Sequence, residues 1–181
     1  MPISQLQSPT RKVEAMTDQR PPSANRPSRE FRNFVEEDLF RILLHLEVPK
    51  ARRLQYSISV VCMTPDLRPA EVDSVLTKRI AEVATRQVRA TDVVTTLSPS
   101  SIGLLLIDAE TRTLPRIHKR LKEELGAHPS SAGGREWSST WSAGGSCYPQ
   151  TAASETDLLG QAMELMARAK EEGGDRLYLP S

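Results

Sequence analysis

Arg89 and Asp92, the first and last residues of the run Arg-Ala-Thr-Asp, are of types that can do binding chemistry. A guanidinium can donate paired hydrogen bonds to an acceptor group, and a carboxylate can accept hydrogen bonds from N–H groups. Arg86 lies one helical turn before Arg89 and is a further basic candidate. Structural roles are open as well, because Arg89 also suits the C-terminal end of a helix dipole and Asp92 suits the cap of a turn.

The other residue types that carry chemistry show no useful spacing. A metal site needs several ligands at short intervals, and a serine hydrolase needs a nucleophile with histidine and acid partners. Ser146 has no recognisable partners of that kind. The histidines and cysteines are scattered singly along the chain: His45, His118, His128, Cys62 and Cys147. The sequence therefore predicts neither a metal site nor a hydrolase.

A β-hairpin is predicted directly after the Arg-Ala-Thr-Asp run. Residues 92–97 (DVVTTL) are rich in β-branched side chains, which favour a half-buried strand. Residues 102–107 (IGLLLI) form a continuous apolar run that is too short for a free helix, so a buried strand is favoured. The polar residues between them form a turn-type cluster around Pro99. Arg89 and Asp92 are thus expected at the base of the hairpin, and Pro99 at its tip.

This region resembles the signature hairpin of GGDEF domains, the bacterial diguanylate cyclases. That family typically has an Arg-x-x-Asp motif, five intervening residues, the sequence Gly-Gly-Asp/Glu-Glu-Phe and then an apolar strand. Here Arg89 and Asp92 match the first motif, and residues 98–102 (Ser-Pro-Ser-Ser-Ile) stand in place of the signature. The resemblance implies a degenerate member of the family, because the frame is kept and the acidic pair is replaced by serines.

The resemblance also indicates where an active cyclase would hold metal and GTP. The family's first strand ends in a metal-binding Asp, and the nearest register here puts Thr64 at that position and Asp66 at the second acid. A second register, with Cys62 at the first position, is also open. Neutral or soft ligands are poor substitutes for a carboxylate on Mg²⁺. The family's phosphate-contacting Arg falls on Gly174, which leaves Lys170. We therefore expect no catalytic residues, no bound metal and no cofactor.

The motif that survives implies a receptor. In many family members the Arg-x-x-Asp motif is an inhibitory site that binds the product, cyclic di-GMP, away from the catalytic centre. By this resemblance Arg89 and Asp92 are the expected ligand-binding residues, and the chain is a catalytically inactive signalling domain that acts as a cyclic di-GMP receptor or regulatory module. Two alternatives stay open: an interaction domain that binds no nucleotide, and a residual diguanylate cyclase.

The predicted organisation is a tail, a helix and one domain. Residues 1–28 are rich in proline and poor in apolar residues, which is typical of a disordered tail. Apolar residues recur at three- and four-residue steps over 29–48, which predicts a helix capped by Ser28 and ended by Pro49. Residues 49–181 form the degenerate GGDEF domain. The N-terminal helix is a candidate surface for a homodimer or a protein partner, and packing on its own domain is the competing interpretation.

The predicted fold class is α+β. Strands are expected at 57–63, 92–97, 102–107, 136–142 and 177–179, with helices at 69–88, at 111–125 and after Ser154. This order contains the ferredoxin-like βαββαβ plan with an extra helix and strand at the C-terminal end. The GGDEF fold is that plan with additions, so the two arguments agree.

Composition excludes several classes of protein. The net charge of +1 offers no general attraction to nucleic acid or an anionic membrane. Two cysteines do not make a disulfide framework, which suits a reducing cytosol. The sequence shows neither a signal peptide nor an apolar run of membrane-spanning length, so a cytoplasmic location is expected. The partner, the regulated process and the oligomeric state are left open.

Overall fold

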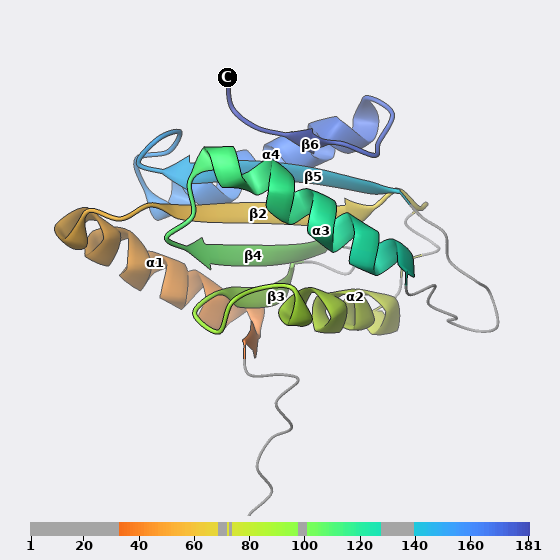
Figure 1. The fold of residues 1–181 in the computed structure, drawn as a ribbon, viewed down its shortest axis with the longest axis horizontal. Coiled ribbons are helices and arrows are strands. Elements are labelled where there is room, and N and C mark those ends of the chain that lie inside the picture. Colours follow the sequence, from red (N-terminus) through yellow and green to blue (C-terminus); the bar gives the residue numbers. More distant parts are fainter. Residues whose placement is uncertain (1–32, 69–71, 73, 98–100, 128–139) are drawn as a thin grey trace, which may run out of the picture.

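The computed structural model describes residues 33–68, 72, 74–97, 101–127 and 140–181 (Figure 1). The predicted tail, the expected N-cap at Ser28, the hairpin tip at Pro99 and Trp137 all lie outside the described residues. In chain order the elements are β1 (Phe34–Val35), α1 (Glu37–Leu54), β2 (Ile58–Pro65), α2 (Ser74–Arg86), β3 (Val93–Leu97), β4 (Ser101–Ile107), the 3₁₀ turn η3 (Thr111–Thr113), α3 (Leu114–Ala127), β5 (Trp141–Tyr148), α4 (Glu155–Glu171) and β6 (Leu177–Tyr178).

The described strands form one six-stranded mixed sheet in the order β1-β3-β4-β2-β5-β6. The central strand β2 pairs antiparallel with β4 on one side and with β5 on the other. The predicted hairpin is confirmed: β3 and β4 pair antiparallel, with Val93 opposite Leu105 and Leu97 opposite Ser101. The short strands β1 and β6 close the two edges, each parallel to its neighbour.

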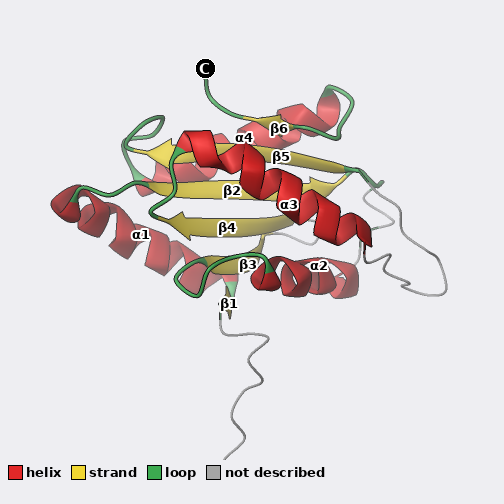
Figure 2. Cartoon of the chain, viewed as in Figure 1, coloured by secondary structure: helices red, strands yellow, loops and turns green. Residues whose placement is uncertain are grey.

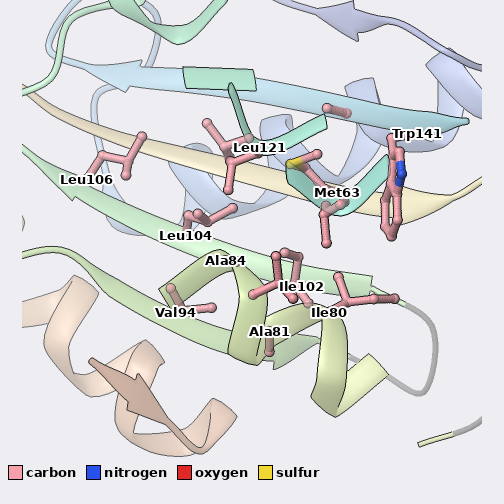
Figure 3. Packing of buried hydrophobic residues seen from close by; sticks show 14 of the residues in the cluster. Met63, Ile80, Ala81, Ala84, Val94, Ile102, Leu104, Leu106, Leu121 and Trp141 are labelled. Carbon is pink, nitrogen blue, oxygen red and sulfur yellow. The ribbon is translucent and has the colours of Figure 1, made fainter. Parts of the chain in front are cut away.

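Helices cover both faces of the sheet (Figure 2). Side chains alternate along β2, as the twofold period of a strand requires. Val61 and Met63 join the core under α2 and α3, whereas Val60 and Cys62 join the core under α1 and α4. Figure 3 shows the first of these cores, in which Ile80 and Leu121 from the two helices meet the sheet. The predicted α+β class is confirmed.

The N-terminal helix differs from its prediction at both ends. It begins at Glu37, because Phe34 and Val35 form the strand β1, which pairs with β3. A strand of two residues is too short to show an alternating pattern in the sequence. It does not end at Pro49 but continues through it to Leu54. Pro49 is on the exposed side of the helix. Ala51, in the turn that follows, is buried in the core at 1% exposure and holds this part of the helix against the sheet. A proline in a helix removes one hydrogen bond but does not forbid the helix where packing compensates.

The fifth strand extends further than the sequence predicted. Of the predicted strand 136–142, residues 136–139 lie outside the described residues, and the predicted end is wrong, because β5 runs from Trp141 to Tyr148. Gly144 and Gly145 both lie in this fully buried strand, although glycine is disfavoured in the interior of a strand. A Cβ on Gly144 would lie 2.2 Å from the carbonyl oxygen of Ala162 in α4. The glycine is therefore present because α4 lies directly on the strand backbone, which is a tertiary requirement.

The remaining elements agree in type and differ at their ends. The helix predicted at 69–88 is α2, and the one predicted at 111–125 begins with η3 and continues past Gly126 to Ala127. Ser154 caps α4 as predicted, since its Oγ accepts from the backbone N–H of Asp157 at 3.1 Å. No helix of the described residues combines the length and the apolar character needed to cross a bilayer.

Candidate functional site

The site is built around Asp92, in the loop that leads from α2 into β3. Its Oδ2 accepts from the backbone N–H of Arg89 at 2.8 Å, and its Oδ1 accepts from the backbone N–H of Ile107 at 3.0 Å. The backbone N–H of Asp92 itself donates to the carbonyl of Arg89 at 3.0 Å. Asp92 is only 5% exposed. The capping role considered from the sequence is therefore present, and this carboxylate ties the loop to the end of β4.

A second contact fixes the same loop from the N-terminal side. The Nδ2 of Asn33 donates to the carbonyl oxygen of Arg89 at 2.7 Å. The carbonyl of Asn33 in turn accepts from the backbone N–H of Val94 at 2.8 Å, next to the pairing of β1 with β3. The backbone of Arg89 is thus held by groups from two other parts of the chain. Its side chain extends from a rigid loop, which lowers the entropy lost when it binds a ligand.

Arg89 and Asp92 line a cavity of about 700 Å³. The cavity lies between the C-terminal end of α2, the loop into β3, the end of β4 and the first turns of α3, on the side of the sheet that α2 and α3 cover (Figure 1). Its volume falls within the range of small-molecule sites. Five arginines contribute to the lining, against the two aspartates Asp92 and Asp108: Arg86, Arg89, Arg112, Arg116 and Arg120.

The arginines differ in how far the protein already engages them. Arg112 forms an ion pair with Glu110 at 2.7 Å, and Arg120 donates to the backbone carbonyl of Gln87. Within the described part of the chain, the side chains of Arg89 and Arg116 have no hydrogen-bond or ion-pair partner. These two guanidinium groups can therefore bind an anion without first giving up a protein contact. Such a lining suits phosphate oxygens, which guanidinium groups bind in pairs.

The arginines of η3 and α3 are site residues that the sequence analysis missed. Arg112 lies in η3, and Arg116 and Arg120 lie in α3, each four residues after the one before. That spacing was visible in the sequence. Its meaning was not, because only the tertiary structure brings the start of α3 opposite the loop that carries Arg89. Arg86, which the sequence suggested, does line the cavity.

The region where an active cyclase would bind metal lies elsewhere, at the end of β2. Asp66 has both carboxylate oxygens engaged: Oδ1 accepts from the Oγ of Ser142 at 2.5 Å, and Oδ2 accepts from the backbone N–H of Asp175 at 2.8 Å. Thr64 is buried in β2, and the Nζ of Lys170 donates to the carbonyl of Pro65 at 3.0 Å. Asp66 therefore ties β2 to the turn between α4 and β6.

That turn has no room for a phosphate-binding side chain at its centre. Gly174 has φ +72°, and a Cβ there would lie 2.7 Å from the Cγ of Asp66. A residue with a side chain at this position would have to displace the Asp66 carboxylate.

The residues that replace the family signature are described only in part. Residues 98–100 lie outside the described residues, and the Oγ of Ser101 donates to the carbonyl of Leu97 at 2.5 Å. Among the residues that the structure does describe, no group of three acids, histidines or cysteines could hold a metal ion.

Comparison with known proteins agrees with this architecture. The family profile described as "Diguanylate cyclase, GGDEF domain" matches residues 69–176, more than half of the chain. The solved GGDEF domain of YfiN (TpbB) from Pseudomonas aeruginosa has a TM-score of 0.73 at 21% identity and covers 83% of this chain and 98% of its own. The FimX GGDEF domain from the same organism has a TM-score of 0.71 at 15% identity, with coverages of 81% and 94%.

A third similar structure was solved with a ligand. The GGDEF domain of DgcB from Caulobacter crescentus, in complex with c-di-GMP, has a TM-score of 0.68 at 11% identity and covers 81% of this chain and 91% of its own. At these identities the structural likenesses show the fold, and the family rests on the sequence profile. No curated protein sequence matches the chain.

Proposed function

The chain belongs to the GGDEF family of diguanylate cyclases, and we propose that it is a member without cyclase activity that binds cyclic di-GMP. The observation that carries this proposal is the arginine-lined cavity of about 700 Å³ around Arg89 and Asp92. In this cavity, arginine guanidinium groups donate hydrogen bonds to both phosphodiester groups of the ligand. Arg89 donates to one phosphate and to the acceptor edge of a guanine, and Arg116 donates from the opposite side.

Asp92 has a positioning role in this proposal. Both of its oxygens already accept a backbone N–H, and the side chain is 5% exposed. A carboxylate oxygen can accept more than one hydrogen bond, so its remaining lone pairs are available to guanine N–H groups at the cavity wall. Its main contribution is to hold the loop so that the Arg89 side chain faces the cavity. We therefore expect Asp92 to affect stability and affinity together.

The proposed absence of turnover rests on the second region. Phosphoryl transfer to a 3′-hydroxyl needs metal ions that clamp the triphosphate and stabilise the developing charge. Here the acidic pair of the signature is replaced by Ser100 and Ser101, and the first metal-binding acid by Thr64 or Cys62. Asp66 is committed to Ser142 and to the turn after α4. Because several of the family's metal-binding groups are replaced or engaged in other contacts, we do not expect even slow cyclase activity.

Isothermal titration calorimetry with cyclic di-GMP tests the receptor function. We expect saturable binding by the full chain, and an affinity at least about tenfold weaker for Arg89→Ala, since a charge-assisted hydrogen bond contributes about 1.5–3 kcal/mol. Arg79→Ala is the matched control, because this exposed arginine of α2 does not line the cavity. Absence of binding at ~100 µM ligand, far above the affinity expected of a specific receptor, would refute the proposal and favour an interaction domain that binds no nucleotide.

Incubation with GTP tests the second half of the proposal. We expect no cyclic di-GMP after prolonged incubation with Mg²⁺ or Mn²⁺, measured by chromatography against a cyclase of known activity. Product that accumulates in proportion to enzyme would show a residual cyclase. The two experiments fail independently, because a cyclase can also carry a product-binding site.

A further inference from the structure

Asp108 is the second acidic residue that lines the cavity, and the function proposed above assigns it no role. It lies directly after the last residue of β4 and is exposed to solvent. Within the part of the chain that the structure describes, no hydrogen bond or ion pair engages its side chain. Its carboxylate can therefore accept hydrogen bonds from a ligand without first losing a protein partner.

The backbone on both sides of Asp108 is held in place. Before it, the N–H of Ile107 donates to the Oδ1 of Asp92 at 3.0 Å. After it, Ala109 is 7% exposed, and its carbonyl accepts from the Oγ of Ser59 in β2 at 2.8 Å. Asp108 itself has φ +52°, a left-handed conformation that aspartate and asparagine adopt more readily than most other residues. The backbone of Asp108 is thus fixed before a ligand binds, which limits the entropy lost on binding.

The same contacts fix Asp108 relative to Arg89. The carboxylate of Asp92 accepts from the backbone N–H groups of Arg89 and Ile107, so it joins the loop into β3 to the end of β4. A guanidinium and a carboxylate are therefore carried by two neighbouring segments of one cavity. Asp92 is less suited than Asp108 to the N–H groups of a ligand, because both of its oxygens already accept and it is only 5% exposed.

Guanine is a base that matches such a pair of side chains. One of its edges carries the acceptors O6 and N7, which suit a guanidinium, and another edge carries the N1–H and the 2-amino group. These two donors lie side by side, so a carboxylate can accept one with each oxygen. Adenine has an acceptor at N1 in place of the N1–H, and a carboxylate there would face a lone pair. A cavity with Arg89 and Asp108 is therefore suited to distinguish guanine from adenine.

We propose that Asp108 is the residue that selects guanine in this cavity. Its two carboxylate oxygens accept from the N1–H and the 2-amino group of one base of the cyclic dinucleotide, while Arg89 donates to the acceptor edge of the same base. This inference rests on the proposed binding of cyclic di-GMP and adds the residue that sets its base specificity. Asp92 holds the two segments together, and the arginines of the lining bind the phosphates.

A purely electrostatic role of Asp108 would have the opposite consequence. Each phosphodiester of cyclic di-GMP carries a negative charge, so a carboxylate that only lies nearby repels the ligand, and its removal would tighten binding. If Asp108 accepts from guanine, Asp108→Asn weakens binding instead, because asparagine keeps one acceptor oxygen and places an N–H donor against the other donor of the base. Asparagine also adopts positive φ readily, so this variant keeps the backbone of the parent.

Isothermal titration calorimetry of the full chain with cyclic di-GMP and cyclic di-AMP tests the inference. We expect the parent to bind cyclic di-GMP at least about tenfold more tightly than cyclic di-AMP. We expect Asp108→Asn to bind cyclic di-GMP at least about tenfold more weakly than the parent, and to discriminate less between the two ligands. Circular dichroism checks that the variant is folded.

Glu123→Gln is the matched control. It removes one negative charge from an exposed residue of α3 that does not line the cavity. Both ligands should bind this variant within about twofold of the parent, because salt screens exposed charges that do not contact the ligand. An Asp108→Asn protein that binds cyclic di-GMP as tightly as the parent, or more tightly, would overturn the inference and leave the receptor function standing.

An inosine analogue tests the contact with the 2-amino group. Cyclic di-IMP lacks that group and keeps the N1–H. We expect the parent to bind cyclic di-IMP about tenfold more weakly than cyclic di-GMP, and Asp108→Asn to show little of this difference. The same loss in both proteins would contradict the assignment of Asp108. No binding of cyclic di-GMP by the parent at ~100 µM would refute the receptor function and this inference with it.

Discussion

Asp92 shows how one buried carboxylate can organise the loop that carries Arg89 at the edge of a cavity. Its two oxygens accept backbone N–H groups of Arg89 and Ile107, which belong to segments on either side of the hairpin. Charge-assisted hydrogen bonds of this kind are stronger than neutral ones, and loss of the acceptor leaves two N–H donors without this partner in a partly buried setting. The residue that looks like a ligand-binding acid in the sequence is first of all a structural one.

Replacement of Asp92 is therefore expected to lower stability as well as affinity. We predict that Asp92→Ala reduces the free energy of unfolding by about 2–4 kcal/mol, since it removes two charge-assisted hydrogen bonds in a partly buried setting. Asp38→Ala, at the exposed start of α1, is the control and should cost less than about 1 kcal/mol. Urea denaturation monitored by circular dichroism measures both. Equal stability of the two variants would show that the Asp92 bonds contribute nothing to the fold.

His118 is a second residue whose setting has a measurable consequence. It is 9% exposed, and its Nε2 has no hydrogen-bond partner within the described part of the chain. Burial, together with the nearby charge of Lys122, lowers the pKa of His118 below its usual value of 6.5. The folded state therefore favours the neutral imidazole. Stability from this group is fully present above pH 6.5 and is lost as the pH falls below that value toward the lowered pKa.

We predict that the protein loses stability between pH 7 and pH 5 with a slope from this residue of at most about 1.4 kcal/mol per pH unit. His118→Gln should flatten the dependence in that interval, because the titrating group is gone. The exposed His45, which contacts Glu155 at 2.9 Å, provides the control variant His45→Gln. Thermal melts at half-unit steps of pH measure the effect. An unchanged slope in His118→Gln would show that other groups account for it.

At the scale of elements, α4 packs directly on the backbone of β5. A Cβ on Gly144 would lie 2.2 Å from the carbonyl oxygen of Ala162 and 2.3 Å from the backbone nitrogen of Met166. These are backbone atoms, so no side-chain rotation can relieve the overlap. Any residue other than glycine must push the helix away from the sheet and open the core beneath it.

We predict that Gly144→Ala destabilises the protein by about 3 kcal/mol or more, which is at the upper end of overpacking effects. Gly160→Ala is the matched control. Gly160 lies in α4, the helix that packs on Gly144, and nothing lies within 4 Å of its added Cβ. That variant should be neutral or more stable by up to about 1 kcal/mol, because alanine favours the helix. Chemical denaturation of both proteins makes the comparison. A Gly144→Ala protein as stable as the parent would mean that α4 packs less closely than described.

The same elements show how far the sequence could predict the fold. The hairpin and the order of elements followed from residue type and period, because β-branched and apolar runs report local burial directly. The ends of α1 and the position of β5 did not. Pro49 is tolerated because Ala51 is buried in the core. Gly144 is required because α4, through Ala162 and Met166, lies against the strand backbone. Both depend on contacts that a local pattern does not contain.

The candidate site divides in the same way. The spacing of Arg89 and Asp92 indicated that the two residues act together, and the structure places both at one cavity. The spacing of Arg112, Arg116 and Arg120 indicated only one basic side of a helix. Their contribution depends on α3 crossing the sheet next to the end of α2, which follows from the sheet order rather than from any local sequence. A short motif therefore predicted part of the candidate site, and the remaining residues are brought to it by the arrangement of the helices on the sheet.

At the scale of the whole molecule, the two faces of the sheet have different roles in this account. The face covered by α2 and α3 carries the arginine-lined cavity, and the face covered by α1 and α4 carries the second hydrophobic core. The end of β2, where an active cyclase would bind metal, is occupied by the contacts of Asp66 with Ser142 and Asp175. The cavity proposed to bind cyclic di-GMP is thus separate from the region where an active cyclase would bind metal.

Hydrogen exchange with and without cyclic di-GMP tests the central claim most directly, because it locates the ligand as well as detecting it. We predict slower exchange at residues 86–92 and 107–120, which surround the cavity, and no change at residues 170–176. Ligand-dependent protection at 170–176 without protection at 86–92 would contradict the account, as would unchanged exchange throughout at saturating ligand.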